Sequence, residues 1–224
     1  MARPTESIID LDALAHNLRL IRRLVGNNCA IMPAVKADAY GHGAVPVSLA
    51  LEQQGCDWLS VATVEEGIEL REAGVSLPIL LLGYVPEEDF DAVIRFRLTP
   101  SLIEVRQAVL LNDAARRQGM RLDVHVNVDT GMHRLGLDWE HAAGAIRGAT
   151  ELAHLRVSGV WTHFARAEDR DMLFCREQFR RFLGVKAQLE AQGRQLLYHT
   201  CNSEVYGRVS SSTASNPPAP SKIP

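Results

Sequence analysis

Two patterns of apolar and polar residues alternate along the chain. In one, nearly every residue of a short run is apolar, which is typical of a parallel strand buried on both faces. In the other, apolar residues recur every three or four positions, which is typical of an amphipathic helix. Strands are expected at residues 31–35, 58–62, 78–82, 97–101, 122–128, 155–161 and 195–200.

Capping signals mark where several of the intervening helices begin and end. Asp10 is placed to cap a helix that Gly26 can end. Thr63 and Glu66 have the spacing of a capping box, and residues 101–104 repeat it, so a helix is expected to start at each place. Further helices are expected after Gly43, after Pro86, after Asp138 and from residue 171 to about 191.

Seven steps of strand and helix favour a closed barrel. Parallel strands joined by helical crossovers close at eight, and about 250 residues are typical of that fold. The Ser- and Pro-rich segment 210–224 has the composition of a disordered tail and contains no run suited to an eighth strand. The expected fold class is therefore α/β, a TIM-type (β/α)8 barrel that lacks its last strand.

Composition agrees with a single domain and narrows the classes of partner. With 224 residues, 46% of them hydrophobic, the chain is long enough for one large α/β domain but not for a second. Its formal net charge is −3 and it has no basic cluster, so neither nucleic acid nor an anionic membrane surface is an expected partner. Neither a signal peptide nor an apolar run near the roughly 18 residues of a membrane span is present, so a cytoplasmic location is expected.

The cysteines and histidines show no spacing typical of metal ligands. No Cys-x-x-Cys pair occurs, so reduced thiols are expected rather than disulfides or a zinc site. The eight histidines form no His-x-x-x-His pair, so no metal is expected, and His125 and His199 are interpreted as wall residues of the barrel. The cysteines are Cys29, Cys56, Cys175 and Cys201.

The stretch 34–43 is the strongest candidate for chemistry. The apolar run 31–35 stops at Lys36, so this lysine is expected at the carboxyl end of a strand, where α/β folds gather their active sites. A lysine that is partly withdrawn from water can serve as a nucleophile or base and form a Schiff base. The alternative is a lysine whose stem packs on the strand while its head reaches water, and position alone does not decide between them.

Four motifs together resemble a known family. Residues 35–43, Val-Lys-Ala-Asp-Ala-Tyr-Gly-His-Gly, resemble the lysine motif of the alanine racemases, which use pyridoxal 5'-phosphate (PLP) and supply D-alanine for peptidoglycan precursors. Residues 129–136, 162–165 and 202–203 resemble further motifs of that family, in the same order. The resemblance implies a PLP-binding N-terminal barrel domain at residues 1–204, followed by a divergent, disordered tail at 205–224.

The resemblance also implies roles for particular residues. Lys36 would hold the cofactor covalently and act as the base for the Cα proton of D-alanine, and Tyr40 would bind the phosphate. Arg134 would bind the phenolate oxygen of the cofactor. Without the resemblance, Tyr40 would be interpreted as an aromatic residue of a loop and Arg134 as a solvated surface charge.

Four further positions take their meaning from the resemblance. His163 would lie beside the pyridine ring, although a lone histidine after a strand is more often only a hydrogen-bonding partner. Asn202 and Ser203 follow the seventh predicted strand, where barrel enzymes commonly bind phosphate. Asn127 stands where some members carry a modified lysine that positions the arginine, so Arg134 must be oriented differently here.

The chain also departs from the family pattern. The eighth strand with its Arg-Pro-Gly motif is not found, since Arg208 is the only arginine after Ser203 and Val209-Ser210 follows it. The β-rich second domain and its opposing catalytic tyrosine are not found either. A truncated or frame-shifted alanine racemase is therefore expected, acting on a small amino acid, homodimeric as in the family, and weak or inactive. The alternatives are a PLP-binding barrel protein without racemase activity and an inert fragment.

Overall fold

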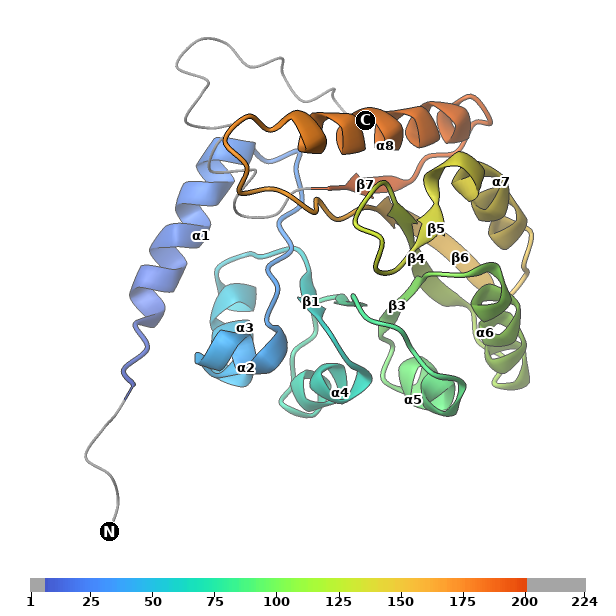
Figure 1. Ribbon diagram of the computed structural model, residues 1–224. Helices are drawn as coiled ribbons and strands as arrows, with labels where there is room; N and C mark the ends of the chain where they lie inside the picture. The colour runs from blue at the N-terminus through green and yellow to red at the C-terminus, as the bar shows by residue number, and fades with distance from the viewer. Residues whose placement is uncertain (1–6, 201–224) are drawn as a thin grey trace.

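Residues 7–200 are described by the computed structural model, and they form a curled sheet of parallel strands covered by helices (Figure 1). The strands are β1 (Leu59–Val61), β2 (Ile79–Leu81), β3 (Thr99–Leu102), β4 (Leu122–Asp129), β5 (Leu137–Asp138), β6 (Leu155–Trp161) and β7 (Leu197–His199). The helices are α1 (Leu11–Val25), α2 (Lys36–Gly41), α3 (Ala44–Gln53), α4 (Val64–Glu72), the 3-10 turn η1 (Glu87–Asp89), α5 (Phe90–Arg95), α6 (Val105–Arg117), α7 (Trp139–Thr150) and α8 (Leu173–Glu190).

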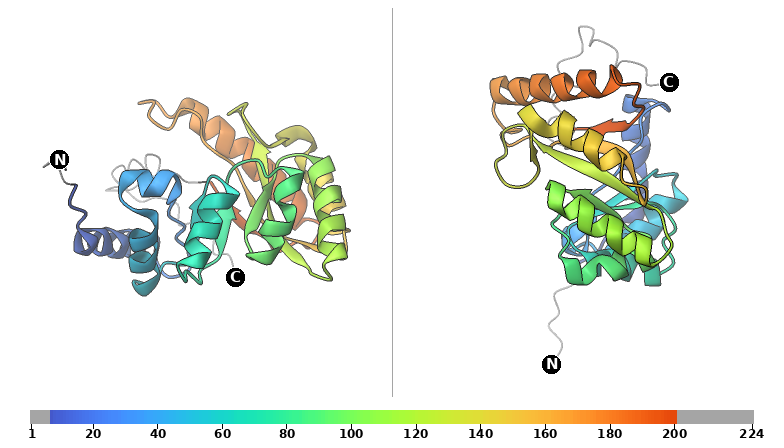
Figure 2. Two further views of the ribbon diagram at one scale, coloured as in Figure 1. Left: turned by 90° about the horizontal axis from the view of Figure 1, so that it is seen from below. Right: turned by 90° about the vertical axis from the view of Figure 1, so that its right-hand side faces the viewer.

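The order of the strands in the sheet follows their order in the chain. Neighbours run β1-β2-β3-β4-β6-β7, all parallel, and β5 pairs with β4 beside this path. Helices α3 to α8 lie outside the curl, and α1 and α6 lie on opposite sides of it in the view of Figure 1 (Figures 1 and 2). A sequential parallel sheet wrapped by helices confirms the α/β barrel class. The tail 205–224 and any further strand beyond residue 200 lie outside the described residues.

The run 31–35 pairs with β1 without forming a regular strand. A single parallel bridge joins Ala34 to Ser60, supported by bonds from Val35 N to Ser60 O (2.8 Å) and from Ser60 N to Pro33 O (2.9 Å). Pro33 has no N–H to continue the ladder, which shortens the pairing. The segment nevertheless extends the sheet beyond β1 and brings Lys36 to the carboxyl ends of the strands.

Most of the predicted helix starts are confirmed, and one is wrong. Asp10 caps α1, Asp138 caps α7, and Thr63 opens α4 with a complete capping box. Ser101, predicted to start a helix, lies instead within β3, where its hydroxyl accepts a hydrogen bond from Trp161 Nε1 at 3.1 Å. Helix α6 begins three residues later than expected, after Glu104, because this tertiary contact holds Ser101 in the sheet.

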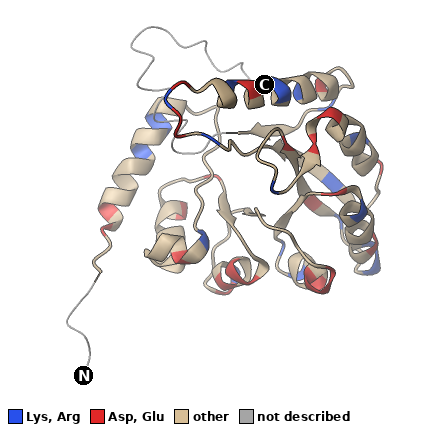
Figure 3. Ribbon diagram, in the orientation of Figure 1, with Lys and Arg blue, Asp and Glu red and all other residues tan. Residues whose placement is uncertain are grey.

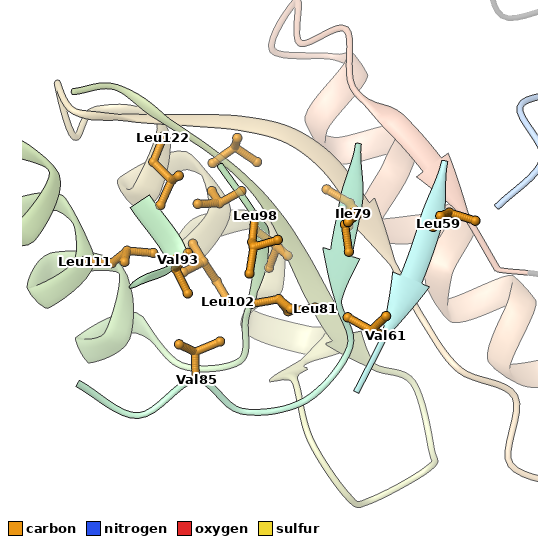
Figure 4. Close-up of a cluster of buried hydrophobic side chains, with 14 of the residues drawn as sticks. Leu59, Val61, Ile79, Leu81, Val85, Val93, Leu98, Leu102, Leu111 and Leu122 are labelled. Atoms are coloured by element: carbon orange, nitrogen blue, oxygen red, sulfur yellow. The ribbon is translucent and has the colours of Figure 1, made fainter. Parts of the chain in front are cut away.

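A continuous apolar core fills the space between the sheet and the helices. Leu59, Ile79 and Leu81 are wholly buried and point into a cluster that includes side chains from the outer helices (Figure 4). Burying one such side chain stabilises the fold by about 1.5–3 kcal/mol. The wholly apolar runs therefore specify the sheet, because both of its faces are covered.

The surface carries mixed charge. Lysine, arginine, aspartate and glutamate are interspersed over the outer helices (Figure 3). Among residues 7–200, no helix is long and apolar enough to span a membrane, and no group of three or more metal-ligating side chains comes together. Cys29, Cys56 and Cys175 form no disulfide, and burial raises the pKa of the Cys56 thiol to about 11.

Candidate active site

Lys36 begins a turn of unusual handedness. The four residues after it, Ala37 to Tyr40, have φ between 51° and 56°, so they form a left-handed helical turn although none of them is glycine. Each such residue costs roughly 1–2 kcal/mol, so the turn stores roughly 4–8 kcal/mol. Strain of this size next to a half-buried lysine is typical of a functional site.

Two carboxylates hold this left-handed turn in place. Glu66 on α4 accepts from Ala37 N at 2.6 Å, and its other oxygen accepts from two amides of the β1–α4 connection. Asp38 joins the turn to the following helix, since its side chain accepts a hydrogen bond from Ala44 N, the first amide of α3, at 2.6 Å. The sequence predicts Glu66 only as part of a capping box, and nothing in the local pattern signals its contact with Ala37, 29 residues away.

Arg134 lies on a loop that leaves β4 and returns to it through β5. The carboxylate of Asp129 accepts from the N–H groups of Gly131 (2.9 Å) and His133 (3.1 Å) and so shapes the start of the loop. Gly136 closes the loop with φ of 116°, where a Cβ atom would lie 2.9 Å from Asp129 N. Arg134 is exposed near the tip of this loop.

Asn127 is buried in β4, beneath this loop. Its Oδ1 atom lies against Gly136, where a Cβ atom would approach it to 3.0 Å. The amide thus packs beneath the closing glycine of the loop.

His163 lies two residues beyond the end of β6 and is half-buried. Burial lowers its pKa, and the positive charges of Arg134 and Lys36 lower it further. The fold therefore brings three of the predicted site residues within electrostatic reach of one another at the carboxyl ends of the strands.

The other predicted site residues are placed less completely. Tyr40 lies on the same left-handed turn as Lys36, with 62% of its surface exposed. Asn202 and Ser203 lie outside the described residues, which end at residue 200 just after β7.

His125 and His199 lie in the wall of the sheet, as the sequence indicates. His125 Nδ1 and His199 Nε2 are 3.0 Å apart, and the His199 ring stacks on Trp161. Burial lowers their pKa values to about 4 and about 3, so both rings are neutral at pH 7. Trp58, which directly precedes β1, packs against the His125 ring.

These observations define a class of protein. A parallel α/β barrel sheet presents a lysine, an arginine and a neutral histidine at the carboxyl ends of its strands, which is where this class binds small anionic ligands and cofactors.

The comparison with protein families narrows the class. The family model described as alanine racemase, N-terminal domain, matches residues 9–215. The chain belongs to this family.

Named relatives and solved structures agree with that assignment. Alanine racemase 2 of Caldanaerobacter subterraneus subsp. tengcongensis is 39% identical over 203 residues, covering 90% of this chain and 52% of that protein. The alanine racemase of Synechocystis sp. is 45% identical over 182 residues, covering 81% and 49%. The solved alanine racemase of Clostridium difficile 630 superposes with a TM-score of 0.88 at 36% identity, covering 92% of this chain and 54% of that one. The chain thus spans about half the length of these relatives.

Proposed function

We propose that this chain is the cofactor-binding barrel of a PLP-dependent alanine racemase, which interconverts L-alanine and D-alanine for peptidoglycan precursors in the cytoplasm. The observation that carries the proposal is the convergence of Lys36, Arg134 and His163 at one edge of the sheet. The names of the relatives support alanine as the substrate.

The chemistry of the convergent side chains fits PLP. Its phosphate and phenolate oxygens are anionic, and the described site places the positive charges of Lys36 and Arg134 near His163. A planar guanidinium suits an oxygen anion, and a partly withdrawn lysine suits covalent attachment. The residues proposed to hold the cofactor are Lys36, Tyr40, Arg134, His163, Asn202 and Ser203.

The residues of this chain have separate tasks in the proposed reaction. When bound, PLP supplies an electron sink that makes the Cα–H bond of an amino acid acidic. Lys36 Nζ removes and returns the proton on one face of Cα. His163, whose pKa is lowered, stays neutral at pH 7 and can contact an aromatic ring without adding a third positive charge. The strained turn after Lys36 fixes the backbone from which its side chain extends.

A second candidate function is PLP binding without racemisation. Lys36, Arg134 and His163 would account for cofactor binding whether or not a bound amino acid reacts. Both candidates share the cofactor site, and they differ in whether alanine exchanges its Cα proton. A homodimer stays a prediction, which light scattering of the purified chain tests.

The test of the shared site is chemical fixation of the cofactor. The chain is incubated with PLP, reduced with borohydride and digested, and we expect mass spectrometry to find a pyridoxyl group on Lys36. Lys36→Arg should abolish the label because arginine keeps the charge but offers no primary amine. Lys186→Arg is the matched control, since Lys186 is half-buried on α8 and should not be labelled. A label that survives Lys36→Arg would assign the cofactor to another amine.

A further inference from the structure

Gln178 on α8 is wholly buried, which is unusual for a glutamine. A buried amide is tolerated only when its donors and acceptor are paired. Its partners are neither on its own helix nor in the apolar core. They belong to the two loops that carry His163 and Arg134.

The first set of contacts is made with the backbone at and just after His163. Gln178 Nε2 donates to His163 O at 3.0 Å, and Gln178 Oε1 accepts from Ala165 N at 2.9 Å. The Gln178 side chain therefore binds the backbone at both ends of the peptide units that join His163 to Ala165. The exit of the chain from β6 is fixed to α8 at this point.

The second set of contacts reaches the Arg134 loop. Gln178 Nε2 also donates to Thr130 Oγ1 at 3.2 Å, and that hydroxyl lies 2.8 Å from Thr162 Oγ1. Thr130 and Thr162 are both buried, and Arg181 of α8 donates to Thr130 O at 2.8 Å. Thr130 is the first residue of the loop that carries Arg134, so the network ties both loops to one helix.

The packing around this network leaves little freedom. At Gly131 a Cβ atom would lie 2.9 Å from the Phe174 ring and 3.4 Å from Gln178 Cγ, so α8 presses directly on the start of the Arg134 loop. A displaced Gln178 could not be compensated by a shift of the helix, because the loop and the helix are already in contact.

We propose that Gln178 is a positioning residue, which fixes His163 relative to Lys36 and Arg134 through the backbone of the two loops. This inference rests on the proposed function, since it assigns Gln178 to the assembly of the same site. Gln178 acts through His163 and the Arg134 loop and touches no reacting atom.

The test measures His163 in the full chain without cofactor. Gln178→Met keeps the length of the side chain and removes all three hydrogen bonds. Gln188→Met is the matched control, because Gln188 is exposed on the same helix. The pKa of His163 is followed by NMR titration, with its resonance assigned by His163→Asn. We expect Gln178→Met to raise this pKa toward the ordinary value of about 6.5, because a released ring gains water and moves away from Lys36 and Arg134. Gln188→Met should leave it unchanged.

A purely structural role predicts a different pattern. In that case Gln178→Met lowers the melting temperature but the pKa of His163 stays at its wild-type value, and the proposal is overturned. If Gln178→Met does not fold, Thr130→Val decides, since it keeps the shape of the side chain and removes the hydroxyl that joins Gln178 to Thr162. The expected shift of the His163 pKa has the same sign, and no shift overturns the proposal.

Addition of PLP separates this inference from the proposed function. We expect Gln178→Met to raise the dissociation constant for PLP about tenfold, the effect of roughly one lost hydrogen bond, while borohydride still fixes the label on Lys36. A wild-type chain that takes no label on Lys36 would defeat the proposed function, and the titration without cofactor would still decide the role of Gln178.

Discussion

Replacing Glu66 with glutamine should loosen the turn that carries Lys36. One carboxylate accepts backbone N–H groups from Ala37 (2.6 Å), Ala62 (2.7 Å) and Thr63 (3.2 Å). Glutamine keeps one acceptor oxygen, but its NH2 group must face an N–H group at the other position. In either orientation of the amide, one hydrogen bond of Glu66 is replaced by a repulsion between two N–H groups.

The magnitude follows from the exposure of the Ala62 and Ala37 amides. Ala62 N is partly buried, and losing its bond to a charged acceptor costs about 1.5–3 kcal/mol. Ala37 N is exposed, so water can replace the acceptor and the loss is about 1 kcal/mol. That smaller loss affects a left-handed turn whose backbone strain is already roughly 4–8 kcal/mol. We expect the free energy of unfolding to drop by about 1–3 kcal/mol and the turn to open locally before the domain unfolds.

Hydrogen exchange and urea denaturation separate these two effects. Exchange of the amides in residues 36–44 should become about tenfold faster, which corresponds to about 1.4 kcal/mol of local opening. Glu69→Gln is the control, because Glu69 is exposed on the same helix. If Glu66→Gln exchanges this segment as slowly as Glu69→Gln does, the turn is held without Glu66 and the reasoning above is wrong.

Three further predictions concern pH, packing and proton transfer. The pKa values of His125 and His199 are lowered in the folded chain to about 4 and about 3, so the unfolded state takes up protons first below about pH 6.5. Urea unfolding should therefore show a loss of about 2 kcal/mol per histidine between pH 6.5 and pH 5, and a flat profile would contradict it. Gly136→Ala should destabilise the chain by about 1–3 kcal/mol through its positive φ and its contact with β4, whereas Gly144→Ala, which meets open space on α7, should not destabilise it; equal melting temperatures would refute this. Because Lys36 is proposed to serve the D-face, NMR with PLP should show faster solvent exchange of the α-deuterium of D-alanine than of L-alanine, and equal rates would require a second base.

Local patterns in the sequence are enough to predict most of the framework. The caps at Asp10, Thr63 and Asp138 form as expected, because a capping bond joins residues two or three positions apart. Most of the apolar runs become buried parallel strands, since such runs are stable only with cover on both faces, whereas 31–35 makes only a single bridge. The motif around Lys36 also indicates the family, because its nine residues are contiguous in the chain.

Where local and tertiary contacts compete, the sequence pattern is insufficient. Ser101 has capping-box spacing but stays in β3, because its hydroxyl meets Trp161 from a strand 60 positions away. The left-handed turn after Lys36 contains no glycine at its four strained positions, so no local signal marks it. The first of these residues is held by Glu66, which the chain brings to it from another helix.

The assembly of the candidate site is decided by tertiary structure. Arg134 and His163 are recognised only through the resemblance, since a turn arginine and a lone histidine after a strand are common in any fold. Their proximity to Lys36 arises because parallel strands place successive carboxyl ends at one edge of the sheet. Gln178 is indistinguishable in sequence from any other polar residue of a long helix. Its burial and its bonds to both loops exist only once α8 packs across the strand ends, because those partners are separated from it by 13 to 48 positions along the chain.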